Sequence, residues 1–340
     1  MNTQKIKNKK KYNEENIKWP KISFIVCTYN CPEHVKRCFG GINNQDYPKE
    51  KIEILALDGG STDNTKDIAK KLGAKVIHNP AKLPEGKGRG KWLGFRKATG
   101  EIVVFIDSDN KLFEKNWIKQ MVKPLILDSE VDFCICRMKV VKTDSLTNRY
   151  LSLIGTDPVA AYKSIDALLA FKKLKLKDKG DYYIYENTLE NFIITGGFYF
   201  MIKKKTLEKI GGYTQDTDVN YNLVKNGLGN IGIPKNAHVH HLIIDSIRNF
   251  FTKKVWWAKV YFRKQKEGRD FNWMPDTSSN KIKLTIIMGG YLLFLPPLVS
   301  GIRLAVRDKE PAWLMHPIMT WLTTVAYFYA FITSKFNKKI

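Results

Sequence analysis

The feature that most constrains the fold is an alternation of short apolar runs and longer polar stretches, which begins at Ile22. The apolar runs are ISFIVC (22–27), IEILAL (52–57), KVIHN (75–79) and EIVVFID (101–107), and stretches of helix length separate them. Such alternation predicts parallel strands joined by crossover helices, which is an α/β fold. Ligands of open sheets of this kind bind beyond the carboxyl ends of the strands. We therefore expect the functional residues where these runs end.

The charge of the chain limits the classes of partner. The 340 residues can bury a full core, and the formal net charge is +24. Such a surplus is typical of proteins that bind nucleic acid or anionic lipid, and composition alone does not distinguish these classes. The chain has five cysteines, an odd number, and they form no paired CxxC arrangement. This pattern indicates neither a disulfide framework nor a zinc site, and it fits a reducing compartment. Residues 1–18 carry six lysines and no apolar stretch, which predicts a disordered basic tail rather than a signal peptide.

Residues 247–262 predict a basic amphipathic helix. A helical projection gathers Ile247, Phe250, Phe251, Val255, Ala258, Tyr261 and Phe262 on one side, with Arg248, Lys259, Arg263 and Lys266 largely opposite. This pattern favours a helix that lies in a membrane interface. The alternative is a helix that docks on the protein's own core.

Two apolar segments follow. Residues 284–302 contain no charged side chain, and in residues 312–334 His316 is the only Asp, Glu, Lys, Arg or His. Each segment therefore matches the roughly 20 residues that cross the hydrocarbon of a bilayer. Pro296 and Pro297 are expected to kink or break the first segment, and a re-entrant hairpin is the alternative to a span. Lysines at the outer ends of the pair predict that both ends are cytoplasmic. The predicted organisation is a tail (1–18), an α/β domain (19–245), an interface helix with a linker (246–275) and a membrane hairpin (282–335).

The loop Asp58-Gly59-Gly60-Ser61-Thr62-Asp63-Asn64-Thr65 places an acid at the end of the second strand. An acid there can accept a hydrogen bond from a nucleotide base, and the glycines allow close approach of the backbone. The alternative is an ordinary turn in which Ser61 or Thr62 caps a helix. The loop alone does not distinguish the two.

Two acids, Asp107 and Asp109, end the strand that covers 102–106. Two carboxylates so close at one strand end repel each other unless a cation or a hydrogen-bond network neutralises them. Mg²⁺ or Mn²⁺ is the simplest neutraliser because these ions take oxygen ligands and bridge diphosphate oxygens. The pair therefore predicts a divalent-metal site, with a solvated turn as the alternative.

Together these segments resemble glycosyltransferase family 2, which has the GT-A fold, a nucleotide-binding α/β sandwich. The resemblance covers about 22–241 and rests on Thr28-Tyr29-Asn30, Asn44-Gln45-Asp46-Tyr47-Pro48, the Asp58 loop and the DxD motif Asp107-Ser108-Asp109. It implies metal binding by Asp109, and nucleotide contacts by Thr28, Tyr29, Asn30, Asp58 and Asp107, the last toward the ribose or the metal. Gly59 departs from the family, which carries a second acid there.

Three further segments extend the resemblance. Lys91, in the basic segment 87–91, matches an arginine position and implies a contact with the diphosphate, as does Arg89. Thr195-Gly196-Gly197-Phe198 and Gly211-Gly212-Tyr213 precede Gln215-Asp216, where the family carries a Glu-Asp pair, so Asp216 is implied as the general base. The alternative for Asp216 is an acid that complements a helix dipole. In the segment 237–241, His241 aligns best as a third metal or diphosphate contact, although the pattern does not settle which of His238, His240 and His241 works.

The resemblance implies an inverting, metal-dependent glycosyltransferase of the hexosyltransferase type. The donor would be a nucleotide diphosphate-sugar, with UDP ahead of GDP, and the acceptor a lipid phosphate or a glycan at an anionic membrane. A polyprenyl phosphate acceptor is already ionised, so Asp216 would then orient it. The chain lacks the Gln-x-x-Arg-Trp segment of processive synthases, which favours limited transfer. We expect a multi-pass protein of the cell membrane with its catalytic domain in the cytoplasm and no nucleic-acid partner. The alternatives are an inactive relative and a basic membrane-tethered nucleic-acid-binding protein.

Overall fold

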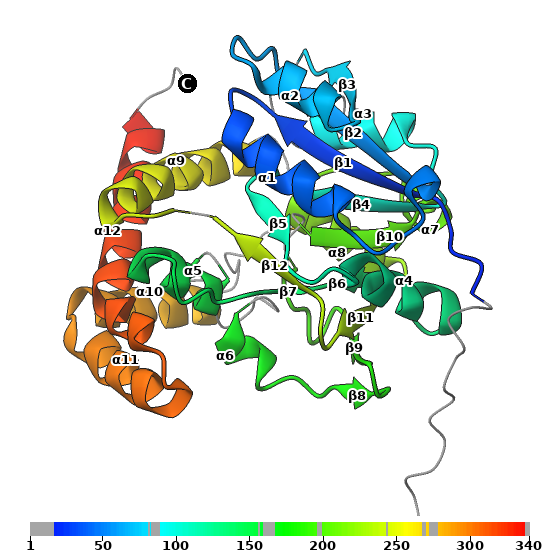
Figure 1. Ribbon diagram of the computed structural model, residues 1–340. Coiled ribbons are helices and arrows are strands. Elements are labelled where there is room, and N and C mark those ends of the chain that lie inside the picture. The colour runs from blue at the N-terminus through cyan, green and yellow to red at the C-terminus, as the bar shows by residue number, and fades with distance from the viewer. Residues whose placement is uncertain are drawn as a thin grey trace, which may run out of the picture.

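A nine-stranded mixed sheet forms the centre of the molecule (Figure 1). The computed structural model describes residues 17–80, 82, 89–155, 157–158, 167–195, 199–242, 244–266, 270–271 and 278–336. The strand order is β3-β2-β1-β4-β10-β6-β11-β9-β8. The predicted tail therefore lies almost wholly outside the described residues.

The amino-terminal half of the sheet confirms the predicted parallel strands. These are β1 (Ile22–Thr28), β2 (Ile52–Asp58), β3 (Lys75–His78) and β4 (Ile102–Ile106). They are joined by α1 (Pro32–Asn43), the 3₁₀ helix η2 (Lys49–Lys51), α2 (Thr65–Lys71) and α3 (Gly90–Lys97). Thr28 pairs in register with Asp58, so the carboxyl ends of β1 and β2 lie side by side.

The other half of the sheet makes it mixed rather than mostly parallel. Strand β10 (Tyr199–Lys203) is antiparallel to both β4 and β6 (Phe133–Ile135). Strand β11 (Asn230–Pro234) runs parallel to β6, whereas β9 (Tyr182–Glu186) and β8 (Lys177–Asp178) pair in antiparallel fashion at the edge. The helices here are α4 (Trp117–Leu127), α7 (Lys204–Glu208) and α8 (Asp216–Lys225). Helix α8 ends two residues before Gly227, whose φ is +72°.

A small second sheet has the order β5-β12-β7. It joins β5 (Asn110–Leu112), β12 (His238–His241) and β7 (Arg137–Met138), and the helices α5 (Leu146–Ile154) and α6 (Leu168–Phe171) follow β7 in the chain. Strand β12 is antiparallel to β5, with His241 opposite Asn110. This register brings the histidine segment next to the DxD motif.

The carboxyl-terminal helices gather on one side of the α/β domain (Figure 1). They are α9 (Ile247–Lys266), α10 (Ser278–Leu292), α11 (Leu295–Asp308), the 3₁₀ helix η3 (Pro311–Met315) and α12 (His316–Phe336). Helix α12 packs along α9, and Phe250, Ala258 and Tyr261 of α9 are buried. The apolar side of α9 is therefore covered largely by the protein itself. This corrects the expected interface helix in favour of the docked alternative.

Neither predicted span appears as a single membrane-crossing helix among the described residues. Within the described residues, no single helix is long and apolar enough to cross a membrane, and one bent pair, 285–292 with 295–308, has the length and composition but turns by 84° at its break. The break expected at Pro296 and Pro297 is confirmed, because both prolines lie in the first turn of α11. The segment 284–302 is thus divided between α10 and α11, and 312–334 falls in η3 and α12.

Candidate active site

The loop after β2 is organised around Asp58. The carboxylate accepts from the backbone N–H groups of Gly60 (2.9 Å) and Ser61 (2.8 Å), and also from the hydroxyls of Ser61 and Thr28. Burial alone would raise the pKa of Asp58, but these hydrogen bonds outweigh it and lower the pKa. Because a carboxylate offers about four acceptor positions, all of them are used by the loop and by Thr28 at the end of β1. Asp58 thus shapes the loop, and its contact with a base stays a prediction.

The loops after β1 and β2 hold each other in place. The side-chain oxygen of Asn30 accepts from the Thr62 N–H (2.9 Å), and the Asn30 N–H donates to the Ser61 hydroxyl (3.0 Å). Asn30 has a φ of +45°, and the exposed ring of Tyr29 lies beside it in the chain. Thr28, Tyr29 and Asn30 therefore lie beside the Asp58 loop, where Tyr29 and Asn30 are exposed and Thr28 is buried.

The structure gives a physical reason for Gly59. A Cβ at this position would lie 3.2 Å from the Cα of Lys82 and 3.5 Å from the Tyr29 ring. The second acid that the family carries would therefore need the segment around Lys82 to shift. The missing acid is compatible with an intact loop.

Lys91 joins two of the predicted acids. Its ammonium lies 3.1 Å from Asp107 and 2.9 Å from Asp216, and its side chain is only 1% exposed. Burial raises the pKa of Asp107, and the neighbouring carboxylates of Asp216 and Asp109 add to this, while Lys91 opposes it. The sequence predicted a contact between Lys91 and a diphosphate. The structure places its ammonium between the DxD motif and the candidate base, and the contact with a diphosphate stays a prediction.

Asp216 lies at the first turn of α8 and is held by a second partner. The hydroxyl of Tyr213 donates to the same carboxylate oxygen that Lys91 contacts. The Tyr213 ring packs on Phe105 of β4, with ring centroids 4.1 Å apart, and Lys91 lies 5.7 Å from its centroid. Gly212 has a φ of +98°, and a Cβ there would meet the Phe95 ring at 2.8 Å. The Gly-Gly-Tyr segment was noticed in the sequence, but the role of Tyr213 was not.

Asp109 and His241 form the other end of the site. The Nε2 atom of His241 lies 3.3 Å from the Asp109 carboxylate, and the Leu242 N–H donates to the Asp109 carbonyl (3.1 Å). Burial alone would raise the pKa of Asp109, but His241, with smaller contributions from Lys253 and His34, lowers it to about 2. Asp109 is therefore an ionised carboxylate.

The three histidines of β12 have different carboxylate partners. His238 pairs with Glu114 (2.7 Å), His240 pairs with Asp144 (2.8 Å), and His241 contacts Asp109. Of the three, His241 is the one that the structure brings to the DxD motif. The register of β12 on β5 fixes this choice, since His241 lies opposite Asn110.

Asp109 and His241 are compatible with a divalent cation. No group of three or more His, Cys, Asp or Glu side chains arranged to hold a metal ion occurs within the described residues. Mg²⁺ is typically bound by one or two carboxylates together with substrate phosphates and water, so a site of few protein ligands is expected for it. The adjacent oxygen of Asp109 and nitrogen of His241 fit such a site, with Asp107 close along the chain.

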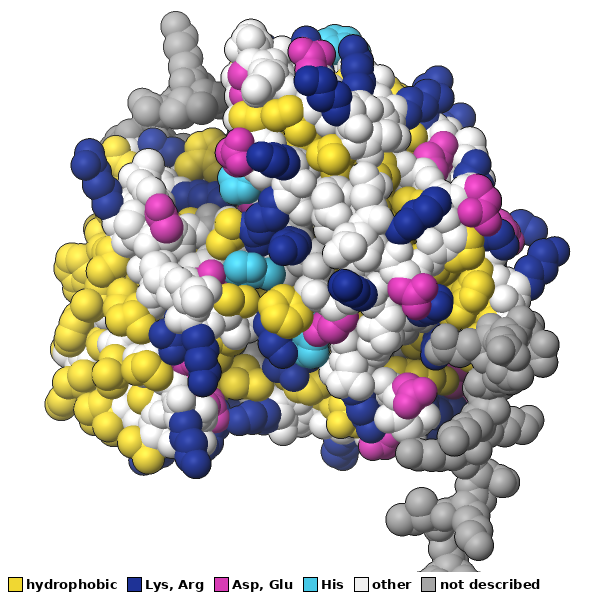
Figure 2. All heavy atoms as spheres, in the orientation of Figure 1, with side chains coloured by type: hydrophobic (Ala, Val, Ile, Leu, Met, Phe, Trp, Pro, Cys, Tyr) yellow, Lys and Arg dark blue, Asp and Glu magenta, His cyan; other side chains and the backbone are white. Residues whose placement is uncertain are grey.

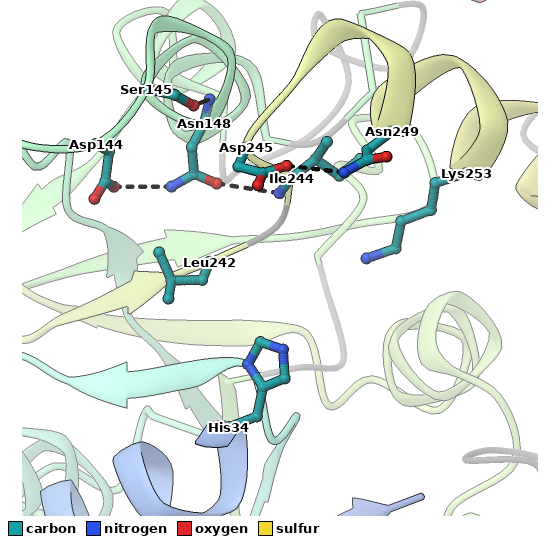
Figure 3. Close-up of a pocket in the computed structure, with 9 residues that line it drawn as sticks. All are labelled: His34, Asp144, Ser145, Asn148, Leu242, Ile244, Asp245, Asn249 and Lys253. Carbon is teal, nitrogen blue, oxygen red and sulfur yellow. Dashed lines mark hydrogen bonds between the residues drawn. The ribbon is translucent and has the colours of Figure 1, made fainter. Parts of the chain in front are cut away.

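A pocket of about 470 Å³ is lined in part by Leu242, whose N–H donates to the Asp109 carbonyl (Figure 3). Figure 3 shows His34 entering from α1, Leu242 from the end of β12 and Lys253 pointing inward from α9. Apart from Ile244, the rest of the lining is polar and consists of Asp144, Ser145, Asn148, Asp245 and Asn249. Asn148 orders this wall, because its amide donates to Asp144 (2.8 Å) and to the His241 carbonyl (3.0 Å). Sequence reasoning did not find this pocket, since its residues come from four separate segments.

Some predicted residues lie outside the described part of the chain. These are Lys87 and Gly88 of the basic segment and Gly196, Gly197 and Phe198 of the acceptor-side segment. Thr195 is described and buried, and its carbonyl accepts from the Asn220 amide of α8 (2.9 Å).

Comparison with known proteins identifies the family. The model described as glycosyl transferase family 2 matches residues 23–211, more than half of the chain. The chain belongs to glycosyltransferase family 2. The α/β domain is thus a GT-A glycosyltransferase domain, and the protein is a glycosyltransferase.

Individual relatives of the glycosyltransferase are distant. A dolichyl N-acetyl-α-D-glucosaminyl phosphate 3-β-D-2,3-diacetamido-2,3-dideoxy-β-D-glucuronosyltransferase of Methanococcus voltae is 24% identical over 91% of this chain and 95% of its own length. Glycosyltransferase AglE of Haloferax volcanii is 31% identical over 31% of this chain and 36% of its own. Among solved structures, the mannosyltransferase PcManGT of Pyrobaculum calidifontis, in complex with GDP-Man and Mn²⁺, has a TM-score of 0.50 at 16% identity, covering 91% of this chain and 87% of that one. This likeness shows the fold.

Proposed function

We propose that this glycosyltransferase moves a sugar from a nucleotide diphosphate donor to a lipid-linked acceptor at the cytoplasmic face of a membrane, with inversion at the anomeric carbon. The observation that carries the proposal is the contact of Lys91 with both Asp107 and Asp216. It places the candidate base beside the motif expected to hold the donor. One direct displacement then requires no covalent enzyme intermediate.

The residues of the chain supply the proton transfer. Asp216 accepts the proton of an acceptor hydroxyl as the acceptor oxygen bonds to the anomeric carbon. The bond from that carbon to the diphosphate oxygen breaks in the same step, and the nucleoside diphosphate leaves with the electron pair. Lys91 and Tyr213 hold the Asp216 carboxylate in one orientation, which is the positioning that a direct displacement needs.

A divalent cation, Mg²⁺ or Mn²⁺, would be held by Asp109 and His241, with Asp107 nearby. When bound, it would neutralise charge on the departing diphosphate. Support comes from the ionised state of Asp109 and from the Mn²⁺ complex of the Pyrobaculum mannosyltransferase. The donor is a nucleotide diphosphate-sugar; we place UDP first and GDP second, the latter because that neighbour binds GDP-Man.

The acceptor is proposed to be lipid-linked and to approach through the pocket beside Asp109. Support comes from the Methanococcus relative, which matches along most of its length and is named for transfer to a dolichyl-linked sugar phosphate. A sugar hydroxyl on such an acceptor needs a base, which Asp216 provides. Lys253 gives the pocket positive charge on the side of the proposed metal site, where its charge also lowers the pKa of Asp109.

Thermal stability of the purified full chain tests the proposal, since a ligand that binds the native state raises its melting temperature. UDP, GDP, CDP and dTDP are each measured with and without Mn²⁺. We expect one nucleotide to raise the melting temperature only together with the metal. Asp109→Ala should abolish that shift, whereas Asp216→Ala should keep it and lose transfer to a lipid-linked acceptor. An unchanged shift in Asp109→Ala contradicts the metal assignment.

A further inference from the structure

A large apolar surface remains exposed on the carboxyl-terminal helices. It is formed by α10, α11 and the turn between them, and we call it the apolar platform: Ile286, Ile287, Leu292, Leu293, Phe294, Leu295, Leu298, Val299, Ile302 and Val306. Leu293 and Val306 are 74% and 75% exposed. Figure 2 shows apolar side chains gathered over this region of the molecule. Contiguous exposed apolar surface of this kind marks an interaction site.

The segment 307–311, which follows the platform and which we call the connector, is attached to the catalytic domain. Asp308 at the end of α11 forms an ion pair with Lys172 (2.8 Å) and accepts from the Trp313 indole (3.0 Å). Glu310 pairs with Arg149 of α5. Trp313 is fully buried against Tyr150 and belongs to the same hydrophobic cluster as the central sheet. If the segments 284–302 and 312–334 both crossed the membrane, this connector would lie on the far side, away from α5. Its contacts with the catalytic domain would then be impossible.

The middle of α12 has polar partners that hydrocarbon would not tolerate. The hydroxyl of Tyr327 donates to Asp157 (2.9 Å), and the same carboxylate forms an ion pair with the buried Lys254 of α9 (3.1 Å). Charged groups at the centre of a bilayer are costly. In this arrangement α12 is a core helix that carries the platform.

The charges around the platform fit an anionic lipid surface. Arg303, Arg307 and Lys309 are exposed along and beyond α11, and Lys281 and Lys283 lie near the start of α10 in the sequence. Interfacial helices combine an apolar face with such basic residues, which are attracted to anionic lipids. The net charge of +24 acts in the same direction.

We propose that the apolar platform inserts into one leaflet of an anionic bilayer and does not cross it. The turn 292–295, where the chain bends by 84°, would be the part that enters most deeply. The connector, residues 307–311, and the catalytic domain then stay on the same side of the membrane. The proposal deepens the proposed function because it states how the active site is held at the surface of its lipid-linked acceptor, and it rests on that function only for the identity of the acceptor.

Binding to vesicles is the first test. The full chain is synthesised cell-free with preformed vesicles of phosphatidylcholine alone or with phosphatidylglycerol, and the floated fraction is measured without nucleotide or acceptor. We expect binding to the anionic vesicles. Leu293→Asp and Val306→Asp should each weaken it by about ten-fold or more, the factor that corresponds to ~1.4 kcal/mol. Leu189→Asp, at an exposed leucine of the catalytic domain, should bind like the wild type.

Equal flotation of Leu293→Asp, Val306→Asp and the wild type would overturn the proposal. So would a wild type that ignores both kinds of vesicle and forms dimers that Leu293→Asp abolishes, because the platform would then be an interface between two copies. Since these variants lie on exposed positions, circular dichroism should show that they fold like the wild type.

The position of the connector is the second test. Inverted membrane vesicles from expressing cells are treated with a membrane-impermeant maleimide, using Lys309→Cys in the connector and Glu50→Cys in the catalytic domain, each measured above the wild-type background. We expect both to react before detergent is added. Reaction of Glu50→Cys alone would show that the connector has crossed the bilayer. It would overturn the proposal that the platform enters one leaflet only. Both tests are independent of catalysis, so a protein that binds vesicles without transferring sugar contradicts the proposed function alone.

Discussion

Replacing Lys91 by methionine tests the link between the DxD motif and the candidate base. The substitution keeps the length and apolar stem of the side chain but removes the ammonium that contacts Asp107 and Asp216. The carboxylates of Asp107 and Asp216 then repel each other, and Lys91 no longer neutralises them. We expect a less stable protein whose Asp216 is no longer held in one orientation.

The expected loss lies between two limits. Breaking a buried ion pair by removing one partner costs about 3–5 kcal/mol, whereas an exposed pair contributes about 0–1 kcal/mol. The Lys91 side chain is 1% exposed, but those of Asp107 and Asp216 are 35% and 31% exposed, so water partly compensates them. Lys91→Met should therefore lower the free energy of unfolding by about 2 kcal/mol. With an unfolding entropy of about 2.1 cal/mol/K per residue, that corresponds to a decrease of roughly 3 °C in melting temperature for a chain of 340 residues.

Urea unfolding followed by tryptophan fluorescence measures this loss, and Lys177→Met is the matched control. Lys177 pairs with Glu130, but their side chains are 58% and 49% exposed, so the same substitution there should cost less than ~1 kcal/mol. We also expect Lys91→Met to slow transfer by about 100-fold, since small misplacements of a catalytic group have effects of that size. A Lys91→Met protein as stable as Lys177→Met, with wild-type transfer, would refute the reasoning.

Three further predictions follow from the site. His241→Ala should lose the metal-dependent part of donor binding in calorimetry, whereas His240→Ala, whose imidazole pairs with Asp144, should keep it; equal effects would contradict the choice of His241. Tyr213→Phe should lower kcat about ten-fold and leave the donor Kd unchanged, because it removes one hydrogen bond that orients Asp216. Hydrogen bonds lower the folded-state pKa of Asp58 despite its burial, so this carboxylate stabilises the fold above its ordinary pKa of ~3.9 and loses that contribution as pH falls below it. Unfolding curves should therefore show a weaker loss of stability between about pH 5 and pH 3 in Asp58→Asn than in the wild type, and parallel curves would argue against it.

The parallel half of the fold was predictable because its signal is local. Strands β1, β2 and β4 are short apolar runs buried along almost their whole length, and such runs are visible in the sequence. The insertion of β10 between β4 and β6 was not predictable, since strand order depends on contacts between distant segments. The partner of α9 was missed for a related reason. An amphipathic pattern shows that one side of a helix is covered but does not show whether lipid or α12 covers it.

In the site, the acids were found and their partners were not. Asp107, Asp109 and Asp216 stand out as carboxylates at the ends of a strand or the start of a helix. The sequence predicted a diphosphate contact for Lys91 but not its contacts with Asp107 and Asp216, because a sequence does not show which lysine is buried between two acids. The role of His241 depends on the register between β12 and β5, where a shift by one residue would bring a different histidine to Asp109.

The pairing of β12 with β5 also has a consequence for how the protein is made. Asp109 leaves the ribosome early, whereas His241 follows only after nearly the whole α/β domain has been synthesised. Contacts between such distant segments form late, because a long loop must close before they gain any stabilising energy. The proposed cation site therefore cannot be completed in a partly made chain. A nascent enzyme would acquire its affinity for donor and metal in a single late step, when strand β12 docks.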